Sequence, residues 1–191
     1  GGDEYTQALR DAIEAAGEAG IVFVCAAGNE AGDNDALPVY PASYDCPNVV
    51  AVAATGKGDE LASFSNWGAA DVDLAAPGVD ILSTARSDWD PSGYATAGGT
   101  SLAAPHVSGA VALMAAVYPE ETPAERIRRL LRGVDRVSGL EGKVASGGRL
   151  NVAKALDRTP PVTTWSGVPG GWSAHDLRLT LSASDDLSGV T

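Results

Sequence analysis

The chain has 191 residues, enough for one domain and a small additional piece. Its formal net charge of −12 argues against nucleic acid as a partner and indicates a well-solvated surface. No apolar run approaches the roughly 18 consecutive residues that a membrane-spanning helix needs, so we expect no membrane span.

The first half of the chain alternates between helical and strand patterns. Apolar residues at helical spacing predict an amphipathic helix that ends near Gly17 or Gly20: Leu9, Ala12, Ile13 and Ala16. Strands are predicted at about residues 21–26, 48–54, 71–75 and 79–84. Helices and strands that alternate at this spacing indicate parallel strands joined by crossover helices, which is an α/β fold.

The second half of the domain is predicted to be mainly helical. A long apolar helix is expected from about Ser101 to Val117. The run Thr122-Pro123-Ala124-Glu125 is a capping box with proline at the first helical position, and it opens a helix to about Arg132. Asn151 begins a last short helix, from Val152 to Leu156.

Asn29 stands directly after a predicted strand. The apolar run before it is bounded by Gly20 and Gly28, and it is typical of a strand buried on both faces in a parallel sheet. Ligands of open α/β sheets bind outside the carboxyl ends of the strands. An asparagine there can donate an N–H to an oxyanion, although Gly-Asn after a strand also occurs as a plain turn.

Ser101 follows a Gly-Gly-Thr turn, at the first turn of the long apolar helix, which we expect to be buried. Glycines such as Gly99 let a substrate backbone come close, and the positive end of the helix dipole favours developing negative charge. The position therefore suits a nucleophile. The simpler interpretation is a Thr or Ser that caps a core helix.

Together these two segments resemble the subtilisin-like serine proteases. Residues 26–29 are similar to that family's oxyanion segment, and residues 99–109 are similar to its nucleophile motif. Four more segments follow in the family's order, namely 40–42, 49–54, 62–68 and 73–78. The resemblance covers roughly residues 1–157. It implies a three-layer α/β fold with a mostly parallel sheet, of which this chain would hold the C-terminal portion.

The resemblance implies a serine endopeptidase that hydrolyses peptide bonds in proteins and works outside the cell, secreted or at the cell surface. Ser101 would be the nucleophile and Asn29 an oxyanion donor, with no cofactor in catalysis. Substrate contacts are implied for Ala26, Ala27, Gly28, Gly99 and Thr100.

The family's catalytic Asp and His precede the serine along the chain, and the resemblance implies that both lie upstream of residue 1. His106 follows Ser101 by five residues, about 140° around the helix, so we expect a buried, hydrogen-bonded structural imidazole. His175 lies in a region of different composition. We therefore expect a C-terminal piece of a protease that is inactive without its upstream part.

Asp73 matches a family position that can bind calcium or sodium together with carbonyls of the 40–49 loop, and a surface aspartate is the alternative. The acidic run Asp33-Asn34-Asp35 is interpreted as a solvated loop.

Cys25 and Cys46 are predicted not to pair, because parallel neighbouring strands would place them at opposite ends of the sheet.

The composition changes at Thr159, which predicts a peptidase portion at 1–158 and a separate piece at 159–191. Residues 177–183 alternate with period two, as in a half-exposed strand. The segment resembles the start of a bacterial immunoglobulin-like β-sandwich module, and a plain Pro/Thr linker is the alternative.

Two other functions remain open at this point. An α/β-hydrolase would also place a serine in Gly99-Thr100-Ser101-Leu102-Ala103, but that fold needs an apolar strand leading into the serine turn. The lead-in from Ser92 to Gly98 does not have that composition. The second alternative is a catalytically inactive pseudoprotease or cell-surface binding module, and retention of both Ser101 and Asn29 weighs against it.

Overall fold

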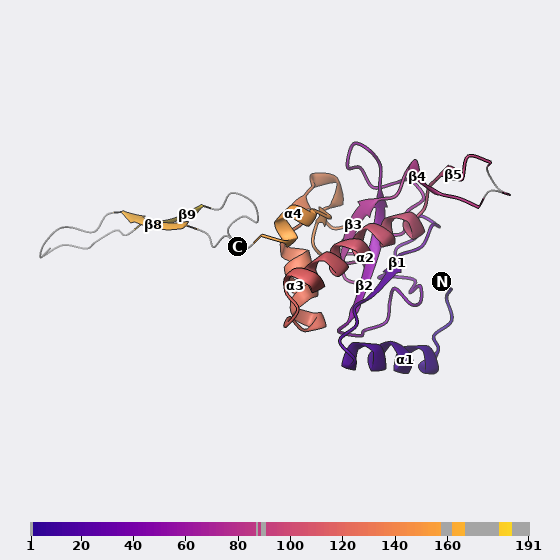
Figure 1. Cartoon of the computed structure of the whole chain (residues 1–191), viewed down its shortest axis with the longest axis horizontal. Helices are drawn as coiled ribbons and strands as arrows, with labels where there is room; N and C mark the ends of the chain where they lie inside the picture. The colour runs from indigo at the N-terminus through magenta and orange to yellow at the C-terminus, as the bar shows by residue number, and fades with distance from the viewer. Residues whose placement is uncertain (1, 87, 89–90, 158–161, 167–179, 185–191) are drawn as a thin grey trace, which may run out of the picture.

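The computed structural model describes residues 2–86, 88, 91–157, 162–166 and 180–184. The helices are α1 (Gln7–Glu18), α2 (Thr100–Val117), α3 (Pro123–Arg132), the 3₁₀ turn η1 (Ser138–Leu140) and α4 (Val152–Ala155). The strands are β1 (Phe23–Ala26), β2 (Val49–Thr55), β3 (Leu74–Pro77), β4 (Ile81–Thr84), β5 (Tyr94–Ala97), β6 (Asp135–Arg136), β7 (Gly148–Arg149), β8 (Val162–Ser166) and β9 (Thr180–Ser184). Figure 1 shows their arrangement.

The central sheet has the order β1-β2-β3-β7-β6. Its first four strands run parallel, and β6 is antiparallel to β7. All seven residues of β2 are buried, as expected for a strand covered on both faces. The predicted burial of the first strand was wrong, because β1 forms one edge of this sheet and only Cys25 among its residues is buried.

The two faces of β2 contact different helices, which gives three layers. Val50, Val52 and Ala54 belong to a core cluster with the inner face of α2. Val49 and Ala51, whose side chains point to the other face, cluster with Ile13 of α1. The sheet therefore lies between α1 and α2, and the predicted three-layer α/β fold is confirmed.

Helix α2 crosses the sheet and buries one side of its surface (Figure 1). Ala103, Val107, Ala110 and Met114 are buried at helical spacing, whereas Leu113 is 52% exposed. The helix, which we expected to be buried, is therefore buried on one side only. Within the described residues, α2 is the one helix long and apolar enough to cross a membrane by length and composition, a test that core helices of globular proteins also pass.

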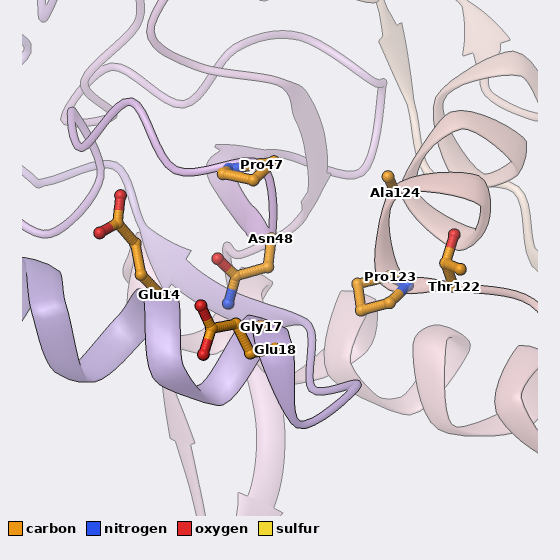
Figure 2. Close-up of a pocket in the computed structure, with 8 residues that line it drawn as sticks. All are labelled: Glu14, Gly17, Glu18, Pro47, Asn48, Thr122, Pro123 and Ala124. Carbon is orange, nitrogen blue, oxygen red and sulfur yellow. The ribbon is translucent and has the colours of Figure 1, made fainter.

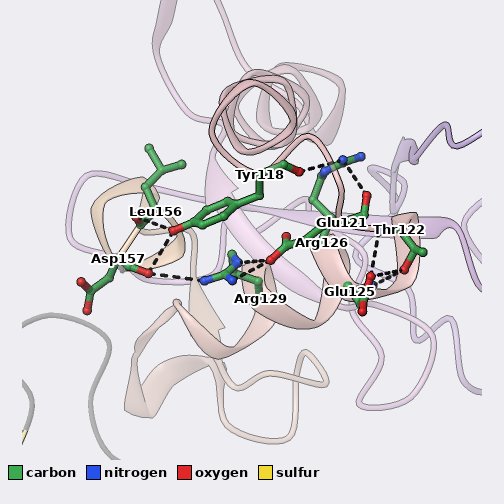
Figure 3. A network of polar contacts seen from close by, with 8 residues as sticks. All are labelled: Tyr118, Glu121, Thr122, Glu125, Arg126, Arg129, Leu156 and Asp157. Carbon is green, nitrogen blue, oxygen red and sulfur yellow. Dashed lines mark hydrogen bonds and ion pairs between the residues drawn. The ribbon is translucent and has the colours of Figure 1, made fainter. Parts of the chain in front are cut away.

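The turn between α2 and α3 is held by the predicted capping box and by an ion pair (Figure 3). The Thr122 side chain accepts from the Glu125 N–H, while the Glu125 carboxylate accepts from the Thr122 N–H at 2.9 Å. Arg129 contacts Glu121 at 2.6 Å and stacks on the ring of Tyr118. The Tyr118 hydroxyl donates to the Leu156 carbonyl oxygen at 2.8 Å, which fixes the end of α4.

The predicted N-cap of α4 is confirmed, because the Asn151 side chain accepts from the Lys154 N–H.

The segment before the nucleophile turn forms a strand that the sequence did not predict. β5 pairs antiparallel with β4 in a separate two-stranded ribbon, and its residues alternate between exposed and partly buried. It is thus not a strand of the central sheet leading into a serine elbow, which removes the structural basis of the α/β-hydrolase alternative.

The C-terminal strands β8 and β9 pair with each other in a second antiparallel ribbon. The strand predicted at 177–183 overlaps β9, and residues 177–179 lie outside the described part of the chain. The division at residues 158 and 159 falls outside that part as well and stays a prediction, as does the immunoglobulin-like module.

Candidate active site

Asn29 lies three residues beyond the end of β1 and is held by the first residue of α2. Its side-chain Oδ1 accepts hydrogen bonds from the Thr100 backbone N–H at 2.9 Å and from the Thr100 hydroxyl at 3.0 Å. The same hydroxyl accepts from the Gly28 N–H at 3.2 Å. Thr100 is fully buried, so this junction between the strand end and the helix start is well defined.

Ser101 is exposed at the first turn of α2 and borders the same space as the Asn29 amide nitrogen. A methyl group on the Cα of Gly99 would lie 3.2 Å from Ser101 Oγ and 3.6 Å from Asn29 Nδ2. Gly99 also has a φ of 149°, which side chains rarely adopt. The Ser101 N–H belongs to the helix turn whose N–H groups have no intrahelical acceptor. The Ser101 hydroxyl, the Asn29 amide nitrogen and the N-terminus of α2 therefore border the same space.

His106, the one histidine in the described part of the chain, does not contribute an imidazole to this space. His106 Nδ1 lies 2.9 Å from the Leu102 carbonyl oxygen, so the predicted hydrogen bond is present. Its predicted burial was wrong, because the side chain lies on the outer side of α2 and is exposed. His175 lies outside the described residues.

Asp73 precedes β3 and lines a cavity of about 410 Å³ together with residues 42–46, Val49, Ala70 and Asp71. Its Oδ2 accepts from the Ala51 N–H at 2.8 Å. Burial raises the pKa of the Asp73 carboxyl to about 6, with a smaller contribution from Asp71 and an opposing one from the Ala51 hydrogen bond. Within the described residues, no three His, Cys, Asp or Glu side chains form a metal-holding group.

The acidic run at 33–35 forms a turn in which Asp35 is exposed and Asp33 partly buried, so the predicted solvated loop is wrong only for Asn34. Asn34 is fully buried, and its amide nitrogen donates to the Ala27 carbonyl oxygen at 2.9 Å. Its Oδ1 accepts from the side chain of Asn66, which is 2% exposed. The sequence patterns did not single out either asparagine. Asn34 lies between two aspartates, which are typical of an exposed segment, and Asn66 lies in a serine-containing segment that is typical of a loop.

Cys25 and Cys46 do not pair with each other, as predicted, and both side chains are buried. β1 and β2 run parallel with Cys25 opposite Ala51, five residues beyond Cys46. Burial raises the pKa of the Cys25 thiol to about 12, so it behaves as a core side chain rather than as a reactive thiolate.

A groove lies between α1 and α3 (Figure 2), at the ends of β1 and β2 that are opposite to the end carrying Asn29. Its volume is about 400 Å³, and it is lined by Glu14, Gly17, Glu18, Pro47, Asn48, Thr122, Pro123 and Ala124. Asn48 precedes β2, whereas Asn29 follows β1, and the two strands are parallel. This groove is therefore remote from Ser101.

Comparison with known proteins relates the chain to one family. Residues 1–140 match the subtilase family, peptidase S8. Thermitase of Thermoactinomyces vulgaris is 40% identical over 157 residues, 82% of this chain and 51% of thermitase. Subtilisin E of Bacillus subtilis strain 168 is 41% identical over 132 residues, 68% of this chain and 32% of that protein.

A third relative is an extracellular protease of Xanthomonas campestris pv. campestris, 39% identical over 140 residues, 71% of this chain and 23% of that protein. The chain thus spans between about a quarter and a half of the length of these relatives. The match to the family covers most of the chain, and the three-layer fold agrees with it. The chain belongs to the subtilase family of serine peptidases.

Proposed function

We propose that this chain supplies the nucleophile and the oxyanion hole of a serine endopeptidase. Ser101 Oγ attacks the carbonyl carbon of the scissile peptide bond, and the hydroxyl proton passes to an imidazole. The carbonyl oxygen becomes an oxyanion that accepts from Asn29 Nδ2 and from the Ser101 N–H. Collapse of the tetrahedral intermediate breaks the C–N bond, and the imidazole returns the proton to the leaving amine. Water then hydrolyses the acyl-enzyme by the same path.

The observation that carries this proposal is the anchoring of Asn29 by Thr100. Because Thr100 donates twice to Oδ1, the amide nitrogen is left to face the space beside Gly99 that Ser101 Oγ also borders. That arrangement offers a hydrogen-bond donor next to a nucleophile, as acyl transfer requires.

We infer that the imidazole and its orienting carboxylate come from a further segment of the protease. His106 is bonded to the Leu102 carbonyl oxygen and lies on the outer side of α2. The same side leaves Leu113 52% exposed, which supports a cover from another part of the polypeptide. The greater length of the relatives supports this inference too. Protein or peptide substrates and an extracellular location are proposed on the same basis, the latter from the Xanthomonas relative.

A structural cation at Asp73 is a separate proposal. Apart from the Cys46 thiol, the polar side chains that line its cavity carry oxygens, including those of Asp45 and Asp71, which suits a hard cation such as calcium or sodium. A carboxyl whose burial raises its pKa gains from a nearby positive charge. Asp73 and neighbouring carbonyls or waters would hold the ion, which takes no part in the reaction.

Hydrolysis of a protein substrate tests the proposed function. The protease that contains this chain together with its base-bearing segment is expected to cleave casein, and Ser101→Ala is expected to abolish cleavage while the protein stays folded. The 191-residue chain alone is expected to be inactive. Cleavage retained by Ser101→Ala would refute the assignment of the nucleophile.

A further inference from the structure

Two buried asparagines, Asn34 and Asn66, are joined side chain to side chain beneath the loop that carries Asn29. Asn66 Nδ2 donates to Asn34 Oδ1 at 2.9 Å, and Asn34 Nδ2 donates to the Ala27 carbonyl oxygen at 2.9 Å. Asn34 is fully buried, and Asn66 is 2% exposed. Buried amides of this kind are costly to leave unbonded, so a satisfied pair fixes the backbone to which it is joined.

Asn66 holds the backbone on both sides of Asn29. Its Oδ1 accepts from the Glu30 N–H at 2.8 Å and from the Gly32 N–H at 3.1 Å, just beyond Asn29. Its own backbone N–H donates to the Gly28 carbonyl oxygen at 3.0 Å, just before Asn29. One residue thus restrains the path of the chain into and out of the position of the oxyanion donor.

The packing at Gly28 tightens this restraint. A methyl group on the Gly28 Cα would lie 2.5 Å from Asn66 Nδ2, so the Asn66 amide occupies the place where a side chain would stand. Gly28 also has a φ of 122°, which few other residues adopt. Asn66 therefore contacts this glycine from one side, while the Thr100 hydroxyl accepts from its N–H.

Asn66 is itself tied to the centre of the sheet. The Ser65 hydroxyl accepts from the Ala54 N–H of β2 at 2.9 Å and donates to the Asn66 carbonyl oxygen at 2.9 Å. If the loop that carries Asn29 were held only through the hydrogen bonds of Asn29 Oδ1, it would be freer to move, because connecting segments are generally mobile. Through Ser65 and Asn66, the loop gains a second attachment to a fully buried strand.

We propose that Asn66, supported by Asn34, is a positioning residue that holds Asn29 in place as the oxyanion donor. The proposal rests on the proposed function of Asn29 and Ser101. Neither Asn34 nor Asn66 donates to the oxyanion; they act through the backbone of residues 27–32. Their role is pre-organisation, since the groups of a catalytic site must be held within about 0.5 Å of the productive geometry.

Asn48 offers a matched control at the other end of the sheet. It is also 2% exposed, and its Nδ2 donates to the carbonyl oxygens of Ile13 and Ile21. Figure 2 shows its amide against Gly17 of α1, where a methyl group on the glycine would lie 2.7 Å from Asn48 Cγ. Asn48 is thus a buried, backbone-bonded asparagine beside a glycine, but one with no connection to Asn29.

The test is a double-mutant cycle between Asn66 and Asn29 in the protease that contains this chain. Active molecules are counted by complete titration with a fluorophosphonate, so that unfolded protein does not enter kcat. Asn66→Ala is expected to lower kcat by about 10-fold with KM changed less than about 2-fold. In an Asn29→Ala background the same change is expected to lower kcat by less than about 2-fold, since the donor that it positions is gone.

Asn66→Ser serves as a milder second variant should the alanine protein not fold, and the same pattern is expected from it. Asn48→Ala is expected to lower Tm and to leave kcat per active molecule unchanged. An Asn66 effect of equal size in both Asn29 backgrounds, or no effect on kcat at all, would overturn the inference. Ser101→Ala is measured alongside, because activity in that variant would instead refute the proposed function on which the inference rests.

Discussion

Asn29 accepts two hydrogen bonds from Thr100 through one atom, its side-chain Oδ1, at 2.9 Å from the backbone nitrogen and 3.0 Å from the hydroxyl. An amide is planar, with its oxygen and nitrogen on different sides, so anchoring the oxygen directs Nδ2 away from Thr100. Residues 71 positions apart are joined by this contact. It orients the proposed donor before any substrate binds, which spares the reaction the cost of reorganising the site.

Removing the donor is expected to slow the chemical step more than it weakens substrate binding. Asn29→Ala should lower kcat by about 10²–10³-fold, a magnitude taken from subtilisin itself, while KM changes little. Thr100→Val retains the backbone N–H and loses only the hydroxyl, so its kcat should fall less. Steady-state hydrolysis of a peptide anilide measures both. A loss confined to KM in Asn29→Ala would contradict the oxyanion role.

The two adjacent glycines before Ser101 are expected to respond differently to the same substitution. Gly99→Ala places a methyl group 3.2 Å from Ser101 Oγ on a backbone whose φ is 149°, and should lower kcat/KM by at least about 100-fold. At Gly98 the nearest atom to such a methyl group, the Gly78 carbonyl oxygen, lies 3.4 Å away. Gly98→Ala should therefore retain kcat/KM within a few-fold. Equal losses at the two positions would show that the turn tolerates no side chain for reasons unrelated to Ser101.

The stability of the protein is expected to depend on pH through Asp73. Burial raises its pKa from 3.8 to about 6, so between these pH values the folded state binds more protons than the unfolded state. In the presence of a metal chelator, the free energy of unfolding should therefore fall as pH rises from about 4 to about 7. Asp73 should contribute roughly 2–3 kcal/mol to this fall. Asp73→Asn should lose that part of the pH dependence and have the higher Tm at pH about 7.5.

Calorimetry of the Ser101→Ala protein, which avoids autolysis, measures this effect with and without calcium. Calcium should raise the Tm of the protein with Asp73 and leave that of Asp73→Asn unchanged. An equal calcium response in both proteins would place the ion elsewhere. An unchanged pH profile in Asp73→Asn would show that another group titrates in this range.

The parts of the fold that could be predicted from sequence are those that local rules determine. The capping box at Thr122 and the N-cap at Asn151 satisfy helix ends with their own side chains, so both appear where the pattern puts them. Strands β6 and β7 have two residues each and carry no periodic signal. β5 was missed because it has only four residues, two of them alanines, and because the pairing with its partner β4 determines it.

In the candidate site too, local patterns locate some residues, whereas the burial of others depends on contacts between distant parts of the chain. Asn29 and Ser101 lie next to strongly patterned elements, so the sequence could place them at a strand end and at a helix start. The burial of Asn34 depends on Asn66, 32 residues further along, and no local pattern encodes that meeting. The exposure of His106 depends on which face of α2 the sheet covers. Tertiary contacts of this kind become visible only in the folded chain.

The most direct test of the account is to find which atom reacts with an electrophile that mimics the scissile carbonyl. The protease that contains this chain is treated with a fluorophosphonate, digested, and mapped by mass spectrometry. A single phosphonyl adduct on Ser101, absent after Ser101→Ala and formed much more slowly by Asn29→Ala, is the predicted result. An adduct on another serine, or labelling that survives Ser101→Ala, would contradict the claim that Ser101 is the nucleophile.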